Sequence, residues 1–272
     1  MFENDIFFVS ATVLVALLTF LCQVTWIIPE LYSHYLALWY LAILFIAYQF
    51  SFCFWKVAKQ NTSVRGRFLP GTLLPNWKYC HYCQLNQPPR AYHCDRCNVC
   101  ILKRCHHCIY TGSCIGYFNQ RYFIILLFWS LVGCTIATCN NLKYLFGHTQ
   151  MSTFAHVLFF FLPMLSYGFG LTDMPFMFAM HYTTTFYSVA TTFALLVYQM
   201  ILIYRNQTLH EWRTGNETYS SRNYGKMLRN LKSVFGSGNL LLTLIFPFKA
   251  GPMESDGLYT SETVMAEHGK FT

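Results

Sequence analysis

Apolar residues gather in long runs that contain no charged side chain. Two such runs, residues 6–28 and 36–55, lie near the start of the chain, and two more cover about residues 122–139 and 181–204. As a helix, each is close to the length that crosses the hydrocarbon core of a bilayer, about 20 mainly apolar residues. The pattern predicts an α-helical polytopic membrane protein with four transmembrane helices.

A further apolar segment, residues 154–171, is shorter and is interrupted by Pro163 and Gly168. A segment of this kind could enter and leave the membrane on one side, lie in the interface, or form a fifth span. Hydropathy alone leaves these three interpretations open.

Composition supports a membrane protein. Hydrophobic residues make up 54% of the chain and charged residues 11%, against roughly 25% charged residues in a soluble domain. Too few charges remain to cover a soluble globule of 272 residues. The first apolar run is not expected to be a cleaved signal peptide, because two acids and no Lys or Arg precede it.

Basic residues predict the orientation of the chain. Of the 19 Lys and Arg residues, 18 lie in residues 56–121 or 205–272, and the positive-inside rule places both segments in the cytoplasm. An even number of crossings must then separate them, so residues 154–171 would be lumenal or re-entrant. We therefore expect transmembrane helices 1 and 2 in residues 1–55, a cytoplasmic cysteine-rich domain in residues 56–121, helices 3 and 4 in residues 122–204, and a cytoplasmic tail.

Cysteines are concentrated in the predicted cytoplasmic domain. Eight of the 12 lie between Cys80 and Cys114, in a reducing compartment that disfavours disulfides. Cys-x2-Cys pairs followed by histidines are typical of tetrahedral structural zinc sites, and metal binding would supply folding free energy to a segment with little apolar content. The spacing indicates two zinc ions; the alternative is a single zinc with spare thiols.

Three stretches resemble one protein family. The run QPPRAYHCDRCNVCILKRCHHCIYTGSCIGYFNQRYF, including Asn119 and Phe123, closely resembles the cysteine-rich domain of the Asp-His-His-Cys (DHHC) protein S-acyltransferases, or palmitoyltransferases. Farther on, NQTLHEW (206–212) resembles the Thr-Thr-x-Glu element of that family. NYGKMLRNLKSVFG (223–236) resembles its C-terminal motif, with Asn230 at a buried polar position.

The resemblance implies two structural zinc sites with interleaved ligands. One would use Cys80, Cys83, His93 and Cys100, and the other Cys94, Cys97, His107 and Cys114. Neither site would keep an open coordination position, so both metals would be structural.

The resemblance also implies a two-step acyl transfer. Cys108 would take a fatty acyl group from acyl-CoA as a thioester and pass it to a cysteine of a membrane-associated protein. His106 would accept the thiol proton, and the family aspartate would orient that imidazole. Lys103 and Arg104 add positive charge, which favours a thiolate. Here Cys105 stands in place of the aspartate.

This substitution leaves several interpretations open. Loss of the orienting charge lowers turnover in serine proteases by about 10⁴, but an unassisted cysteine is already partly ionised, so we expect slower catalysis. The main alternative is a catalytically impaired homologue that acts as a membrane scaffold or adaptor. Cys105 could also be acylated itself or form a disulfide with Cys108. A further interpretation is a membrane-anchored zinc module for protein or nucleic-acid binding. It is disfavoured because it leaves the His106–Cys108 stretch without a function.

Partners and compartment are expectations of the same kind. The phosphates of coenzyme A would meet Lys103, Arg104 or Arg121, and the chain would lie in the lipid bilayer. Recruitment of protein substrates would rest on the membrane-proximal surface or on an accessory subunit; no nucleic acid is expected. Gly133 and Ser130 would serve close helix packing or, alternatively, leave room for an acyl chain. Span length favours the ER or Golgi membrane over the plasma membrane.

Overall fold

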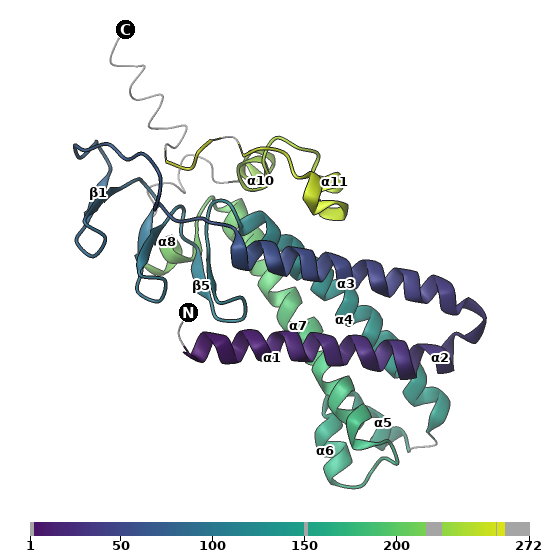
Figure 1. The fold of residues 1–272 in the computed structure, drawn as a ribbon. Helices are drawn as coiled ribbons and strands as arrows, with labels where there is room; N and C mark the ends of the chain where they lie inside the picture. Colours follow the sequence, from purple (N-terminus) through teal and green to yellow (C-terminus); the bar gives the residue numbers. More distant parts are fainter. Residues whose placement is uncertain (1–2, 150–151, 216–224, 254, 259–272) are drawn as a thin grey trace. The chain divides into compact units, whose positions relative to one another are not determined.

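The computed structural model describes residues 3–149, 152–215, 225–253 and 255–258. Four stretches are long and apolar enough to cross a membrane: Asp5–Leu31, Ser33–Lys59, Gln120–His148 and Phe176–Tyr204. The first comprises α1 (Glu3–Cys22), a π-helical turn η1 (Gln23–Ile27) and α2 (Ile28–Leu31); the second η2 (Ser33–Tyr35) and α3 (Leu36–Lys59); the third α4 (Gln120–His148); and the fourth α7 (Phe176–Tyr204). The four predicted transmembrane helices are confirmed (Figure 1).

The interrupted apolar segment forms two short helices. α5 (Thr153–Phe161) has nine residues and α6 (Pro163–Gly168) has six, too few for either to span a bilayer. The break falls at Pro163, which starts α6 because a proline ring is tolerated in a first helical turn and not in the middle of a helix. The side of the membrane on which α5 and α6 lie stays a prediction.

The chain forms two compact units, each assembled from segments that are distant in sequence. The helical unit comprises residues 11–51 and 126–197, and the cysteine-rich unit comprises residues 1–10, 52–125 and 198–272.

The helical unit has an apolar core and a buried polar network. Ile27, Leu145, Phe159, Phe178 and Tyr182 belong to the apolar core, and all five are fully buried. Many other apolar side chains of the spans are exposed, as expected for helices surrounded by lipid.

The polar network is centred on Gln23, in the π-helical turn. Its amide nitrogen donates a hydrogen bond to Asn141 Oδ1 at 2.9 Å and lies 3.0 Å from His181 Nε2. Its carbonyl oxygen accepts from Asn140 Nδ2 at 3.2 Å, and Asn141 Nδ2 donates to Thr185 Oγ1 at 3.1 Å. Polar side chains in a membrane helix are expensive unless they are paired, so this network joins the first, third and fourth spans.

Gly133 supports the packing interpretation over the cavity interpretation. A Cβ atom at this position would lie 3.1 Å from Ile46 Cγ2, so α4 and α3 approach closely there. Small residues at helix interfaces allow this approach.

The cysteine-rich unit contains three short antiparallel hairpins. They are β1 (Lys78–Cys80) with β2 (Leu85–Gln87), β3 (Tyr92–Cys94) with β4 (Val99–Ile101), and β5 (His106–Cys108) with β6 (Ser113–Ile115). Gln84 and Asn98 each follow the second cysteine of a Cys-x2-Cys pair, and both have positive φ, 52° and 48°. The first two hairpins therefore repeat one turn geometry around two pairs of thiols.

Within its described residues, the tail has four short helical segments: α8 (Leu209–Arg213), α10 (Met227–Phe235), α11 (Leu240–Ile245) and η3 (Pro247–Lys249). The first two residues of the predicted C-terminal motif, 223 and 224, lie outside the described residues. Asn230, predicted at a buried polar position, is 3% exposed. Its side-chain amide donates to the carbonyl oxygens of Ile203 at 2.8 Å and Tyr204 at 3.3 Å, so it joins α10 to the end of α7.

Candidate metal centres and reactive cysteine

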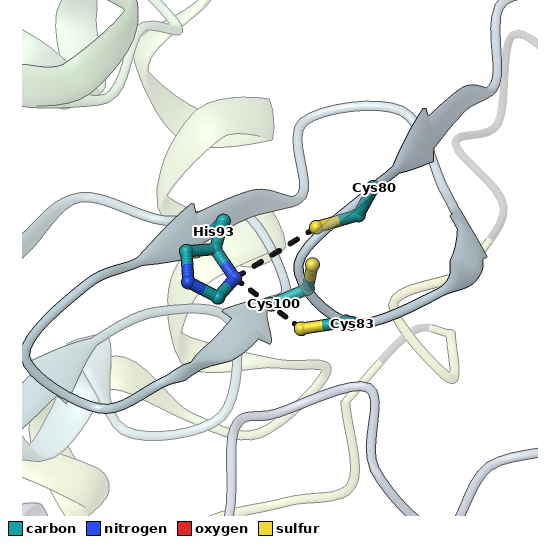
Figure 2. A group of neighbouring side chains, drawn as sticks. All are labelled: Cys80, Cys83, His93 and Cys100. Atoms are coloured by element: carbon teal, nitrogen blue, oxygen red, sulfur yellow. Dashed lines mark hydrogen bonds between the residues drawn. The ribbon is translucent and has the colours of Figure 1, made fainter.

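The first cluster brings together Cys80, Cys83, His93 and Cys100 (Figure 2). His93 Nδ1 lies 3.7 Å from Cys80 Sγ and 3.2 Å from Cys83 Sγ. The two thiols come from the turn of the first hairpin, and His93 and Cys100 face each other across the second, where they are register partners. The cluster therefore joins two hairpins.

The second cluster brings together Cys94, Cys97, His107 and Cys114. His107 Nδ1 lies 3.7 Å from Cys94 Sγ, 3.3 Å from Cys97 Sγ and 3.6 Å from Cys114 Sγ. His107 and Cys114 are register partners across the third hairpin. The second cluster thus joins the second hairpin to the third, and the two clusters interleave along the chain.

Both clusters fit tetrahedral zinc. Bonds of about 2.3 Å to sulfur and about 2.0 Å to nitrogen place neighbouring ligand atoms about 3.6 Å apart, and all four donor atoms of each cluster lie within 4.8 Å of one another. Two Cys3His sets are consistent with two zinc ions, so a single metal with spare thiols is disfavoured. A full set of four protein ligands is typical of structural zinc.

The third hairpin separates metal ligands from the remaining reactive side chains. Successive side chains of a strand point to opposite faces, and His107 faces the second cluster. His106 and Cys108 therefore share the other face of β5. Cys108 is 7% exposed, and its carbonyl oxygen accepts a hydrogen bond from Thr111 Oγ1 at 3.5 Å within the turn of the hairpin.

Cys105 continues this hairpin, because its backbone N–H donates to the Ile115 carbonyl oxygen at 2.8 Å. Burial raises the pKa of its thiol to about 11, although hydrogen bonds from the Leu209 backbone and the Gln199 side chain act in the opposite direction. The thiol is thus neutral at pH 7 and is held by the tail. Strand alternation places Cys105 and Cys108 on opposite faces, which disfavours a disulfide between them.

His106 has no orienting acid in the described part of the chain. Its Nδ1 atom is buried and has no hydrogen-bond partner there. Burial and then the charge of Arg104 lower the pKa of His106 to about 4, and its ring packs edge-on against Phe123 with centroids 5.3 Å apart. The imidazole is therefore neutral at pH 7, and packing positions it.

Asp95 and Glu211, two acids that could have oriented His106, have other partners. The Asp95 side chain is 96% exposed and lies 3.8 Å from His93 Nε2. Glu211 is fully buried, and its two carboxylate oxygens accept from Arg90 Nε and Nη2, both at 2.7 Å. Burial would raise the pKa of Glu211, but Arg90 and the Thr208 N–H outweigh it and lower the pKa. Glu211 therefore joins the tail to the cysteine-rich hairpins.

Asp5 is a site residue that sequence reasoning missed. Its side chain is 1% exposed, and its Oδ2 atom lies 3.1 Å from His107 Nε2. Its Oδ1 atom accepts from Arg96 Nη1 at 2.8 Å. A carboxylate on the second nitrogen of a metal-binding histidine fixes the tautomer and orientation of the ring. The only sequence signal was an acid just before an apolar run.

Asn119 and Arg121 organise the exit from the third hairpin. The Asn119 side chain is fully buried; it donates to the carbonyl oxygens of Val57 at 3.1 Å and Cys114 at 2.9 Å, and accepts from Gly116 N at 2.8 Å. Arg121 was a candidate for binding coenzyme A phosphates, but it donates to the carbonyl oxygen of Gly251 at 2.7 Å. Its guanidinium therefore holds the tail.

Comparison with known proteins places these features in a family. The profile of the family described as DHHC palmitoyltransferase matches residues 74–216. The protein named "Probable palmitoyltransferase ZDHHC24" from Homo sapiens is 32% identical over 77% of this chain and 73% of its own length. The proteins of the same name from Rattus norvegicus and Danio rerio are 32% and 34% identical, over 74% and 78% of this chain and 70% and 71% of their own lengths.

Proposed function

The chain belongs to the DHHC palmitoyltransferase family, and we propose that it acts through a thioester on Cys108. The acyl donor is a long-chain acyl-CoA, and the acceptor is a cysteine of a membrane-associated protein. The observation that carries this proposal is the third hairpin, whose strand β5 (His106–Cys108) combines a metal-binding histidine on one face with a histidine and a cysteine on the other.

In the first step, the thiol of Cys108 passes its proton to His106, and its sulfur attacks the thioester carbonyl of acyl-CoA. Collapse of the tetrahedral intermediate breaks the carbon–sulfur bond to coenzyme A, and the departing thiolate takes the proton back from the imidazolium. In the second step, His106 accepts the proton of the target cysteine, whose sulfur attacks the acyl-Cys108 carbonyl. The released Cys108 thiolate is then reprotonated.

Eight residues would hold two zinc ions: Cys80, Cys83, His93 and Cys100 at one site, and Cys94, Cys97, His107 and Cys114 at the other. When bound, the metals would supply folding free energy to the three hairpins. Asp5 orients His107 from outside the ligand sphere, and Glu211 holds Arg90 and the tail against the second hairpin.

Catalysis should be slow because Cys105 replaces the family aspartate. The unpartnered Nδ1 of His106 supports this expectation. The same observation favours a second candidate function, in which an impaired homologue serves as a membrane scaffold or adaptor held together by its metal sites. The two functions differ in whether Cys108 carries an acyl group.

The cysteine-rich domain and the C-terminal tail would face the cytoplasm, because they hold 18 of the 19 Lys and Arg residues. Two crossings before residue 56 would put the N-terminus on the same side. The membrane would be that of the ER or Golgi, and an accessory subunit could help to recruit the protein substrate.

Autoacylation tests the proposal. The zinc-loaded protein, reconstituted in nanodiscs, is incubated with labelled palmitoyl-CoA, and hydroxylamine-sensitive label is followed in wild type and three variants: Cys108→Ser, Cys105→Ser and Cys105→Asp. We expect label in all except Cys108→Ser, with faster loading in Cys105→Asp. Label in none of them, with both zincs retained, would favour the scaffold. Label in Cys105→Asp alone would identify Cys105 as an inactivating substitution.

A further inference from the structure

A cavity of about 310 Å³ lies beside Cys105. Its lining includes three arginines and three histidines, of which His107 belongs to the second metal cluster: Arg96, Arg104, Arg213, His106, His107 and His210. The cysteine-rich hairpins and α8 of the tail both contribute to the wall. The cavity is therefore rich in positive charge and in hydrogen-bond donors.

Negative charge on the wall is scarce. Asp95 also lines the cavity, but its side chain is 96% exposed and lies 3.8 Å from His93 Nε2, which is not part of the wall. Asp5 is paired with Arg96. Among the described residues, the cavity wall thus has three arginines and one carboxylate, beside Cys94, which would be a thiolate when zinc is bound.

Two buried nitrogen atoms of the lining residues lack hydrogen-bond partners. Arg104 Nε and His106 Nδ1 are both buried, and neither has a hydrogen-bond partner within the part of the chain that the structure describes. Arg104 Nη1 lies 3.0 Å from His210 Nδ1, so part of this guanidinium is already engaged. Buried donors without acceptors are rare because leaving them unpaired is costly.

The missing acceptors coincide with a change in the sequence. Cys105, which lines the same cavity, offers a thiol where the family motif has a carboxylate. A carboxylate accepts several charge-assisted hydrogen bonds, whereas a thiol is a weak acceptor. The surroundings of position 105 thus remain suited to an acid that the chain does not provide.

We propose that this cavity binds a small free carboxylate whose oxygens accept hydrogen bonds from Arg104 Nε and His106 Nδ1. By accepting a hydrogen bond from Nδ1, the bound anion fixes the tautomer and the orientation of the His106 ring. Binding needs only the cavity and its donors. The effect on Cys108 rests on the proposed function, because the anion acts as a diffusible substitute for the missing aspartate.

Acetate and formate are suitable probes because they supply a carboxylate with almost no other bulk. Initial rates of Cys108 loading are measured in nanodiscs as either salt replaces chloride at constant ionic strength. We expect a saturable increase of about tenfold in wild type, below the roughly 10²–10⁴-fold that a positioned proton-transfer group contributes. Cys105→Ser should respond similarly, whereas Cys105→Asp should respond by less than about twofold, because its own carboxylate already supplies the charge.

Binding is measured separately by saturation-transfer NMR on the acetate methyl protons. The full-length zinc-loaded protein should give a saturable signal that Arg104→Gln removes, while Lys78→Gln, outside the cavity wall, leaves it unchanged. Zinc content, measured on each variant, shows that the fold persists.

Each outcome separates this inference from the proposed function. Saturable acetate binding that depends on Arg104, together with no loading of Cys108 in any variant, supports the carboxylate site and refutes the acyltransferase mechanism. Equal acceleration in wild type and Cys105→Asp overturns the inference. So does saturation by inorganic phosphate with no response to acetate, which would reassign the cavity to phosphate groups.

Discussion

Removing the Arg90 side chain tests how the tail is held. In the native protein both oxygens of Glu211 accept from Arg90 at 2.7 Å, and Oε2 also accepts from Thr208 N at 2.8 Å. The two side chains are 8% and 0% exposed. Arg90→Met keeps most of the aliphatic volume but leaves the buried carboxylate with the backbone donor at Thr208.

The expected cost is large because a charge remains without its partner. Breaking a buried pair by removing one member costs about 3–5 kcal/mol. Arg90 also donates to the Asn206 carbonyl oxygen at 3.0 Å, which adds to the loss, whereas the remaining Thr208 bond reduces it. We therefore expect about 4 kcal/mol, close to a thousandfold rise in the equilibrium constant for detachment of α8.

The assay pH follows from the sign of the pKa shift. The pKa of Glu211 is lowered in the folded protein, so the stabilisation is fully present above the pKa of an unfolded glutamate, about 4.3. It is lost only as the pH falls through the lower, folded value. A measurement at neutral pH records the whole contribution.

Hydrogen exchange measures the detachment directly. Amide protection in α8 is compared at neutral pH between wild type, Arg90→Met and a control variant, Arg213→Met. The control removes an exposed arginine that lies within α8 itself. Arg90→Met should lose protection by the predicted factor, and Arg90→Met with Glu211→Leu should recover much of it, because no buried charge remains. Equal protection in the two single variants would refute the reasoning.

Three further predictions address other contacts. Asp5→Asn should release zinc to a chelator about tenfold faster, since partners beyond the ligand sphere typically change metal affinity 10–100-fold, and unchanged release would exclude a role in orienting His107. Gly116→Ala should cost about 1–3 kcal/mol, because the new Cβ would lie 2.6 Å from a backbone oxygen, while Gly71→Ala meets nothing within 4 Å; thermal unfolding compares the two. Gln23→Leu should lower the thermal midpoint in nanodiscs, at about 1–3 kcal/mol for unpaired buried groups, and an unchanged midpoint would show that the polar network is dispensable.

Local pattern was enough to predict the spans and the metal ligands. A membrane-spanning helix must satisfy its backbone within one continuous segment, so the apolar runs carried the necessary information. A tetrahedral metal needs particular side chains at short spacings, and both predicted clusters assembled. The family resemblance rested on this same compact stretch, and there the comparison with known proteins confirmed it.

Contacts between segments that are distant in sequence could not be predicted from local pattern. Asp5 is 102 residues from His107, and Glu211 is 121 residues from Arg90. No periodicity or spacing links such pairs, because their meeting depends on how the tail and the first helix return to the hairpins.

The surroundings of Cys105 show the same division. Its position in the motif was visible in the sequence, together with the loss of the aspartate. Its contacts with Gln199 and the Leu209 backbone, and the unpartnered Nδ1 of His106, follow from burial beneath the tail. The sequence alone determined that position 105 carries a thiol and no carboxylate. The tertiary structure decided which groups surround that thiol and His106, because charges and hydrogen bonds act through space between segments that are distant in sequence.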